Sequence, residues 1–223
     1  LGNGLPDDIT PLAVVLIKDK LRENVNDTIN YFKEQGVALK VISGDSVKTV
    51  QNIAKDTGIT GAENAIDMTT VKTQEELEKA AENCSVFGRV TPQQKKQLVI
   101  ALKKKGHSVA MTGDGVNDVL ALKEADCSIA MAAGSDAARN VSQLVLVNND
   151  FASMPGVVAE GRRTINNLER SSALYIVKTI YTIILSVFFI FFHMPYPFEP
   201  IHFSLVGALT VGLPSFVLAL QPN

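Results

Sequence analysis

Short apolar runs alternate with amphipathic stretches over residues 13–160 of the chain. The runs have the length of buried strands, and the stretches between them carry apolar residues at helical spacing. Pro92 suits the first turn of a helix, and Gly36, Gly58 and Gly106 follow helices that they would end. We therefore expect strands at 13–17, 37–42, 85–87, 108–112, 128–131 and 144–147, and helices at 25–35, 47–57, 73–83 and 92–105.

This alternation of strand and helix is typical of a mostly parallel sheet with helices on both faces. We predict a Rossmann-like α/β domain over residues 1–160. In such sheets the reactive loops follow the carboxyl ends of strands. Polar clusters stand at two of these ends, Ser43-Gly44-Asp45 and the seven residues Thr-Gly-Asp-Gly-Val-Asn-Asp at 112–118.

The C-terminal part of the chain has a different pattern. Residues 173–192 are a run of 20 with only Lys178, Thr179, Thr182 and Ser186 outside the apolar set, and residues 201–220 contain no acid, Lys or Arg. At about 1.5 Å per residue, each stretch spans a hydrocarbon core of roughly 30 Å. We predict a stalk at 161–172, two transmembrane helices, and a Pro-rich extracytoplasmic turn at 193–200. A hairpin buried inside a larger protein is the alternative.

Charge supports this division. The chain has 21 Lys and Arg against 23 Asp and Glu, a balance that excludes a strongly basic nucleic-acid-binding protein. Only Lys178 and Glu199 carry charge within residues 171–223. Three arginines precede the first span and the turn has no Lys or Arg, so the positive-inside rule places the soluble part in the cytoplasm. The sequence thus predicts a multi-pass protein of the cell membrane, with the lipid bilayer as a partner and no nucleic acid.

Candidate chemistry lies in the polar clusters. Asp114, Asn117 and Asp118 put three oxygen-bearing side chains on one Gly-rich loop, and oxygen ligands suit Mg²⁺. Ser43 can donate a hydrogen bond to a phosphoryl oxygen. Lys95 lies in the first turn of its helix, where a cation opposes the helix dipole unless an anion such as a phosphoryl group lies beside it. A turn is the usual explanation of an Asp-Gly loop, but the seven-residue string at 112–118 is far more specific than a turn. Taken alone, Lys95 is better explained as a solvated surface lysine.

The spans contain candidates for a transport path. Gly207, Gly212 and Pro214 interrupt the second span, and broken helices recur at transport sites, although a simple kink is the alternative. Lys178 is an ionisable residue inside the membrane, which makes it a functional candidate unless it extends to the interface. The candidate residues are Lys178, Thr179, Thr182, Gly207, Thr210 and Pro214.

In this order the motifs resemble those of P-type ATPases, which belong to the haloacid-dehalogenase superfamily. Residues 43–45 are similar to the TGD motif with Ser in place of Thr, residues 87–95 resemble the segment that carries Pro-x-x-Lys, and residues 112–118 match TGDGxND. Residues 18–22 occupy the place of the Asp-Pro-Pro-Arg segment without its prolines. Residues 160–167 resemble the stalk before the fifth transmembrane helix, and residues 212–214 resemble the GLP of the sixth.

The resemblance implies a phosphorylation domain followed by transmembrane helices five and six, with Mg²⁺ as cofactor and ATP as substrate. It implies catalytic roles for Ser43, Lys95 and Asp114, and metal binding by Asp114 and Asp118. Phosphate or nucleotide binding is implied for Arg22, Ser43, Gly44, Asp45, Lys95, Gly113 and Asn117. The implied chemistry is phosphoryl transfer from ATP to an aspartate and hydrolysis of the aspartyl phosphate.

The sequence lacks the DKTGT string that carries the nucleophile of this family. Asp19-Lys20 follows a predicted strand, but Leu21-Arg22 replaces Thr-Gly. We therefore expect a fragment of a pump that lacks its N-terminal part and is inactive by itself. Calcium or another divalent cation is the favoured transported ion. The alternatives are a fragment of a lipid-translocating P-type ATPase, a free-standing Mg²⁺-dependent phosphatase with Asp19 as nucleophile, and a non-catalytic membrane partner of an intact pump.

Overall fold

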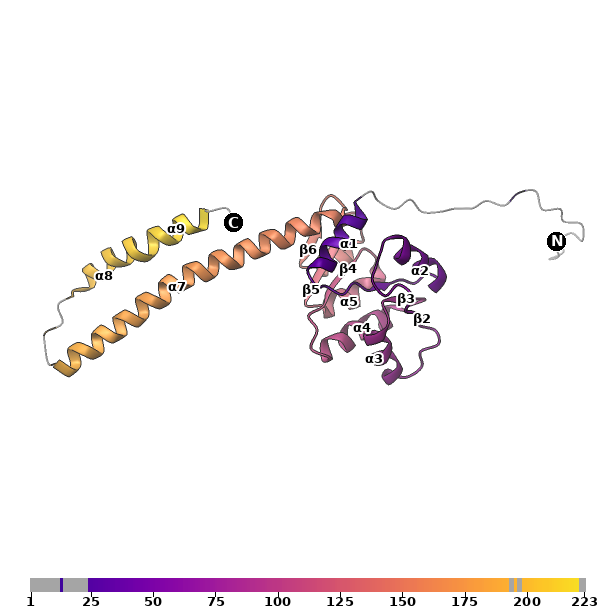
Figure 1. Cartoon of the computed structure of the whole chain (residues 1–223), viewed down its shortest axis with the longest axis horizontal. Coiled ribbons are helices and arrows are strands. Elements are labelled where there is room, and N and C mark those ends of the chain that lie inside the picture. Colours follow the sequence, from indigo (N-terminus) through magenta and orange to yellow (C-terminus); the bar gives the residue numbers. More distant parts are fainter. Residues whose placement is uncertain (1–12, 14–23, 193–194, 196–197, 221–223) are drawn as a thin grey trace, which may run out of the picture. The chain divides into compact units, whose positions relative to one another are not determined.

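The computed structural model of the chain describes residues 13, 24–192, 195 and 198–220. It divides into two compact units, Leu1–Ala152 (unit 1) and Ser153–Asn223 (unit 2), each described by itself (Figure 1). Unit 1 contains the alternating strands and helices, and unit 2 contains the apolar helices.

Strands and helices alternate along unit 1. Its elements are α1 Val25–Glu34, β1 Val41–Ile42, α2 Val47–Asp56, β2 Ala65–Asp67, α3 Gln74–Asn83, β3 Val86–Gly88, α4 Pro92–Lys104, β4 Ala110–Gly113, a 3₁₀ turn Val116–Asp118, α5 Val119–Glu124, β5 Cys127–Met131, α6 Asp136–Val141 and β6 Leu144–Leu146. The predicted helix ends are confirmed, because Gly36, Gly58 and Gly106 follow α1, α2 and α4 with positive φ angles.

One predicted strand is much shorter in the structure, one observed strand was not predicted, and one predicted strand lies almost entirely outside the described residues. Only Val41 and Ile42 of the predicted strand 37–42 are in β1, because its partner β3 begins at Val86 and pairs with Val41. Strand β2, which is three residues long and pairs with β3, was not predicted. Of the predicted strand 13–17, Ala13 is not in a strand and residues 14–17 lie outside the described part of the chain.

The strands of unit 1 form two parallel sheets, in the orders β1-β3-β2 and β4-β5-β6. The parallel pairing was predicted correctly, but the described residues form two three-stranded sheets where a single sheet was expected. β1 and β4 are each an edge strand. Their carboxyl ends carry the two polar clusters that the sequence analysis selected.

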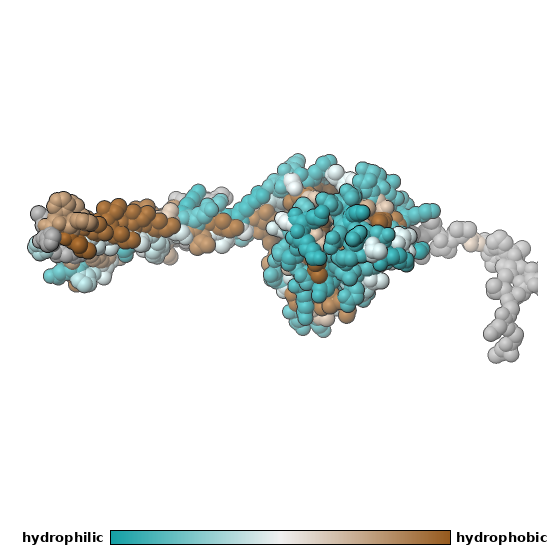
Figure 2. All heavy atoms as spheres, turned by 90° about the horizontal axis from the view of Figure 1, so that it is seen from below, coloured by the Kyte–Doolittle hydropathy of each residue, from teal (hydrophilic) through white to brown (hydrophobic). Residues whose placement is uncertain are grey.

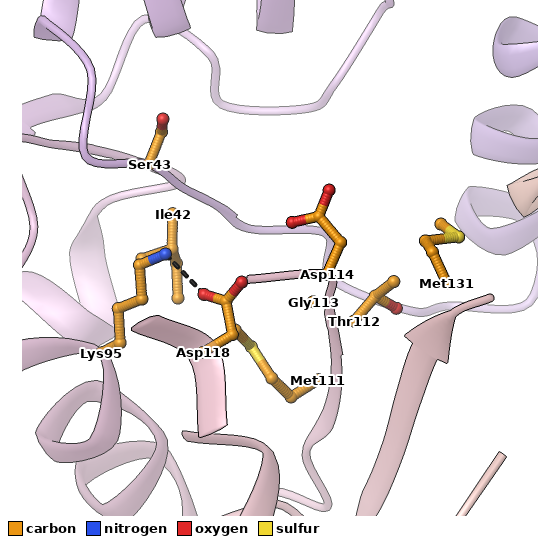
Figure 3. A pocket seen from close by; sticks show the side chains of 9 residues that line it. All are labelled: Ile42, Ser43, Lys95, Met111, Thr112, Gly113, Asp114, Asp118 and Met131. Carbon is orange, nitrogen blue, oxygen red and sulfur yellow. Dashed lines mark hydrogen bonds and ion pairs between the residues drawn. The ribbon is translucent and has the colours of Figure 1, made fainter. Parts of the chain in front are cut away.

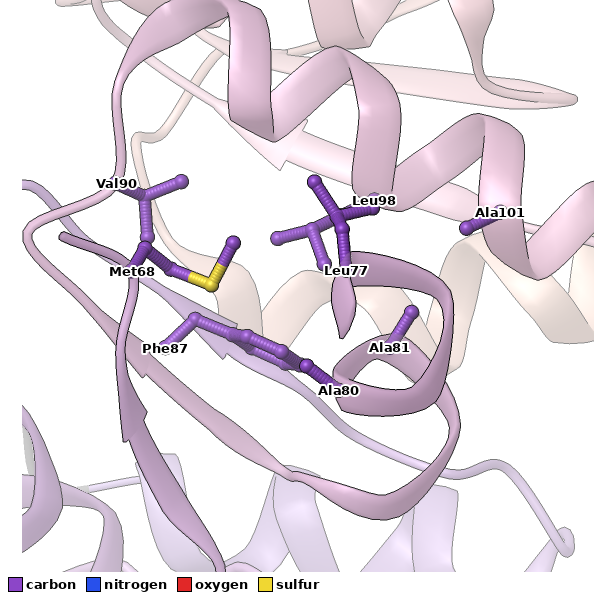
Figure 4. Close-up of a cluster of buried hydrophobic side chains, with 8 residues drawn as sticks. All are labelled: Met68, Leu77, Ala80, Ala81, Phe87, Val90, Leu98 and Ala101. Atoms are coloured by element: carbon purple, nitrogen blue, oxygen red, sulfur yellow. The ribbon is translucent and has the colours of Figure 1, made fainter. Parts of the chain in front are cut away.

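Helices cover both faces of the first sheet. Successive side chains of a strand point to opposite faces, and in β3 Val86 packs with Val50 and Ala54 of α2. Its neighbour Phe87 packs on the other face among residues of α3 and α4 (Figure 4). That second cluster comprises Met68, Leu77, Ala80, Ala81, Phe87, Val90, Leu98 and Ala101.

Helix α4 contributes to the core of both sheets. Leu98 belongs to the cluster around Phe87, whereas the adjacent Val99 packs with Met111 of β4 and Ala130 of β5. Because both sides of α4 are buried, its first turn is held in one place relative to the ends of β1 and β4. That turn carries Lys95.

Unit 2 consists of α7 Met154–Phe192, α8 Pro200–Gly207, a π-helical turn Ala208–Gly212 and α9 Leu213–Leu220. The stretches Phe151–Phe192 and Pro200–Leu218 are long and apolar enough to cross a membrane. Figure 2 shows apolar residues along these helices and mainly hydrophilic ones over the visible face of unit 1. The predicted interruption of the second span is present as the π-helical turn before Pro214. Proline has no backbone N–H, so Pro214 cannot donate a hydrogen bond to the preceding turn of the helix.

Candidate functional site

A cavity of about 300 Å³ lies at the carboxyl ends of β1 and β4 in unit 1 (Figure 3). The residues that line it are Ile42, Ser43, Lys95, Met111, Thr112, Gly113, Asp114, Asp118 and Met131. Five of the predicted site residues therefore share one cavity: Ser43, Lys95, Gly113, Asp114 and Asp118. They come from three separate segments of the chain, which the two sheets and α4 bring together.

Lys95 and Asp118 form a nearly buried ion pair. The Lys95 ammonium donates to Asp118 Oδ1 at 2.6 Å, and the two side chains are 11% and 10% exposed. Helix α4 begins with a capping box in which Thr91 and Gln94 exchange hydrogen bonds. The carboxylate of Asp118 thus supplies the anion that a cation in this first turn needs, a role that the sequence analysis assigned to a phosphoryl group.

The loop after β4 folds back onto itself. Asp118 Oδ2 accepts a hydrogen bond from the Gly115 amide at 3.2 Å. A Cβ at position 113 would lie 2.6 Å from the Cβ of Asp118, so only glycine allows this close approach. Asp114 stays exposed, and its side chain extends on the side of the cavity where Ser43 and Asp118 lie (Figure 3).

The loop after β1 is fixed by the loop after β3. The Ser43 amide donates to Phe87 O and the Ser43 carbonyl accepts from the Val90 amide, both at 3.0 Å. Gly88 makes this packing possible, because a Cβ there would lie 2.7 Å from the Cα of Val47. The Ser43 hydroxyl donates to Asp45 Oδ2 at 3.0 Å and points away from the Lys95–Asp118 pair (Figure 3). It would have to exchange this partner to bind a phosphoryl oxygen.

Arg89 and Asp67 lie beside this loop. Arg89 adopts a φ of 53° and donates its amide to Asp45 O at 2.8 Å. Its guanidinium lies 3.7 Å from the carboxylate of Asp67, at the end of β2. The pKa of Asp67 is held below its ordinary value of 3.8, first by the Thr69 hydroxyl and amide and then by Arg89. Asp67 is thus an anionic group at neutral pH on the same edge of the sheet.

Three of the described predicted site residues are not part of the cavity wall. Gly44, Asp45 and Asn117 do not line it, although Asp45 reaches it through Ser43. Arg22 lies outside the described residues. Thr112 belongs to the matched motif at 112–118 but was not selected as a site residue. Met131 and the loop after β5, in which the Ser135 amide donates to Asp114 O at 2.7 Å, were not predicted. The rule about carboxyl ends of strands would have found this loop at the end of the predicted strand 128–131.

The donor set of the cavity fits Mg²⁺. Asp114 offers an exposed carboxylate, and the hydroxyl-bearing residues Thr112 and Ser43 also line the wall. Among the described residues no group of three or more His, Cys, Asp or Glu could hold a metal ion. Mg²⁺ does not need such a group, because it commonly binds one or two carboxylates and takes its other ligands from water and phosphate. Both oxygens of Asp118 already accept hydrogen bonds, which leaves Asp114 as the available carboxylate.

A second cavity, of about 180 Å³, lies within unit 2 and is lined by Ala173, Leu174, Val177, Lys178, Tyr181, Thr210 and Val211. A Cβ at position 207 would lie 2.5 Å from the Lys178 ammonium, so this group sits against Gly207. The hydroxyls of Thr179, Thr182 and Thr210 donate to carbonyls one turn earlier in their own helices. Of the predicted transport residues, Lys178 and Thr210 line the cavity, whereas Thr179, Thr182, Gly207 and Pro214 do not.

Residues 4–126 match the family model of the haloacid dehalogenase-like hydrolases. The chain is 44% identical over 229 residues to the calcium-transporting ATPase CtpE of Mycolicibacterium smegmatis, and 43% identical over 226 residues to the probable cation-transporting ATPase exp7 of Streptococcus pneumoniae. Each alignment covers 98% of this chain and 29% of the relative. The chain therefore spans less than a third of the length of these relatives.

Among solved structures, a zinc-transporting PIB-type ATPase in an E2.Pi state matches 91% of this chain and 27% of that one, with a TM-score of 0.65 and 20% identity. This match shows the fold. The resemblance to P-type ATPases is confirmed by the relatives, and membrane localisation agrees with them and with the two apolar helices. On the matched residues, the chain belongs to the haloacid dehalogenase-like hydrolase family, and its sequence relatives are cation-transporting P-type ATPases.

Proposed function

We propose that the chain is the C-terminal half of the phosphorylation domain and a membrane hairpin of a P-type ATPase that couples ATP hydrolysis to cation transport. The observation that carries this proposal is the shared cavity of Ser43, Lys95, Asp114 and Asp118. Calcium or another divalent cation is the favoured transported ion, since two relatives are named as calcium-transporting and cation-transporting.

Each residue of the cavity has a proposed role in phosphoryl transfer. Asp114, with its exposed carboxylate, would bind Mg²⁺, which when bound neutralises charge on the phosphoryl oxygens. Lys95 would contact a phosphoryl oxygen with its ammonium, and Ser43 would donate its hydroxyl to another. Asp118 holds the Lys95 ammonium at the cavity wall. Its own role as a metal ligand remains a prediction, because both of its oxygens accept hydrogen bonds.

The nucleophile is proposed to come from a segment outside this sequence. No DKTGT string occurs in the chain, and the cavity lies where two edge strands, β1 and β4, end. A strand that ended between them would bring an aspartate to the cavity, because the reactive ends of parallel strands meet at one edge of a sheet. The partner is thus the remaining part of the pump.

The membrane hairpin is proposed to contribute to the transport path. Lys178 and Thr210 line one cavity, and the π-helical turn Ala208–Gly212 departs there from regular hydrogen bonding. Irregular backbone in a membrane helix is tolerated where it is packed in protein or lines a cavity. Unit 1 is proposed to lie in the cytoplasm, where ATP is available.

Formation of an aspartyl phosphate tests the proposal. The polypeptide from the complete open reading frame is incubated with labelled ATP and Mg²⁺, and the acid-stable, hydroxylamine-sensitive label is measured. We expect label in the wild type, its loss in Asp114→Ala, and its retention in the control Asp27→Ala, whose side chain is exposed and outside the cavity. Absence of label in the wild type would overturn the proposal.

Two further measurements separate the alternatives. Faster dephosphorylation with calcium supports a cation pump, whereas stimulation by phospholipid alone would favour a lipid-translocating ATPase. If the chain by itself hydrolyses a phosphate ester with Mg²⁺ and Asp19→Asn abolishes this activity, the chain is a phosphatase and the pump proposal fails.

A further inference from the structure

Residues 132–135, between β5 and α6, form a loop in which every backbone amide has a hydrogen-bond partner; we call them the β5 loop. The Ala132 amide donates to Leu146 O at 3.1 Å, and the Gly134 amide donates to Met131 O at 3.0 Å. The Ala133 amide donates to the side chain of Asn149 at 2.5 Å. The Ser135 amide donates to Asp114 O at 2.7 Å. The loop is therefore tied to Asp114 at one end and to the segment after β6 at the other.

The β5 loop lies directly against the backbone of Asp114. A Cβ at position 134 would lie 2.6 Å from Asp114 O and 3.0 Å from its Cα. Glycine at 134 thus allows two backbone segments to touch. Any movement of the β5 loop at this point would move Asp114 or open a gap beside it.

Arg139 of α6 holds the β5 loop by hydrogen bonds to its carbonyls. Its Nη1 donates to Ala132 O and, at 2.8 Å, to Gly134 O, and its Nη2 donates to Asp136. The planar guanidinium presents several donors in a fixed geometry, so one side chain can bind two carbonyls of a turn at once. Ser135 caps α6, since its hydroxyl accepts from the Ala138 amide.

Asn149 provides the second anchor. Its φ is 53°, a conformation that asparagine tolerates better than most residues. The backbone conformation and the side-chain contact with Ala133 can therefore be separated by mutation: glycine keeps the conformation and removes the acceptor, whereas aspartate keeps both.

We propose that Arg139 and Asn149 are positioning residues for the metal site, which act through the β5 loop to hold the backbone of Asp114. Neither residue lines the cavity. The inference rests on the proposed function for the role of Asp114 in binding Mg²⁺. Residues that orient a metal ligand commonly change metal affinity 10- to 100-fold when they are replaced, and we expect about a tenfold effect for each of these two residues.

Two measurements on the full chain in detergent test the inference. Amide hydrogen exchange follows Ser135, whose amide donates to Asp114, and calorimetry with Mg²⁺ alone measures affinity. We expect Arg139→Met and Asn149→Gly to accelerate exchange at Ser135 and to weaken Mg²⁺ binding about tenfold. Asn149→Asp should retain wild-type values in both measurements. The Cys84 amide, which donates to Ala80 O at the end of α3, serves as the internal control and should exchange at an unchanged rate.

The outcomes are separable. Unchanged exchange at Ser135 in both variants, or an unprotected Ser135 amide in the wild type, would refute the hydrogen-bonded loop. Faster exchange with unchanged Mg²⁺ affinity, in a chain where Asp114→Ala does lose affinity, would refute the positioning role. If Asp114→Ala leaves Mg²⁺ affinity unchanged, the metal assignment in the proposed function fails, and exchange at Ser135 alone decides about the loop. If one variant unfolds by circular dichroism, the other decides.

Discussion

The ammonium of Lys95 lies 2.6 Å from Oδ1 of Asp118, and this contact joins the first turn of α4 to the turn after β4. Both side chains are almost withdrawn from water, so each depends on the other for its charge to be tolerated. The ion pair also holds the Lys95 ammonium, a hydrogen-bond donor, at the wall of the cavity that Asp114 lines.

Removal of one partner should cost more than removal of both. We expect Lys95→Met to lower the free energy of unfolding of unit 1 by about 3 kcal/mol, because it leaves the Asp118 carboxylate buried and unpaired. The double variant Lys95→Met with Asp118→Leu should recover a large part of this loss. The free energy of unfolding of both variants is measured by urea denaturation of the full chain, with hydrogen exchange of the amides in α4 as the readout. A double variant that is less stable than the single variant Lys95→Met would contradict this prediction.

Gly88 is expected to be intolerant of a side chain. A Cβ there would lie 2.7 Å from the backbone N and Cα of Val47, atoms that cannot move without shifting α2. We expect Gly88→Ala to cost about 1–3 kcal/mol, as overpacking commonly does. The matched control is Gly44→Ala in the neighbouring loop, where a Cβ would meet no atom within 4 Å. Equal stability of the two variants in thermal unfolding would show that a side chain at position 88 is tolerated, which would contradict this prediction.

The capping box of α3 predicts a specific dependence on pH. The amides of Lys72 and Thr73 donate to Glu76 and lower the pKa of its carboxyl below the ordinary value of 4.5. A depressed folded-state pKa stabilises the protein above the unfolded pKa, and this stabilisation is lost as pH falls through the folded pKa. We therefore expect Glu76→Gln to be less stable than wild type at pH 7, with the difference decreasing below pH 4.5.

Urea denaturation at a series of pH values measures this difference. Glu75→Gln is the control, because it removes an acidic group from the same first turn of α3 outside the capping box. A difference between Glu76→Gln and wild type that grows toward low pH would show that the sign is wrong.

Gly207 should affect transport more than stability. A Cβ at this position would meet only the end of the Lys178 side chain, which is flexible and can move away. In the complete pump we expect Gly207→Ala to shift the cation concentration for half-maximal dephosphorylation severalfold, while thermal stability stays close to wild type. In the control Gly212→Ala the nearest atom is Gly207 O at 3.8 Å, an ordinary contact. Identical cation dependence in both variants would argue against a role for the Lys178 ammonium in the transport path.

Local features of the fold could be predicted from the sequence because they depend on neighbours in the chain. The capping box of Thr73 and Glu76, the proline in the first turn of α4 and the glycine after each helix are all determined within one helical turn. The apolar stretches of unit 2 are recognisable for a similar reason, since a membrane span is a matter of length and composition. The selection of Ser43, Lys95, Asp114 and Asp118 followed from motifs and from the rule for strand ends.

Contacts between distant segments were decided only by the tertiary structure. Lys95 and Asp118 are separated by 23 residues in the sequence. The position of Lys95 in the first turn of its helix indicates that an anion should lie nearby, but it does not indicate which residue supplies that anion. The short strand β2 exists because β3 lies beside it, and the contact of Gly134 with Asp114 exists because β4 and β5 pair in one register. Propensity and periodicity report on a residue's own element, whereas side-chain pairing and close backbone approach depend on how the elements pack together.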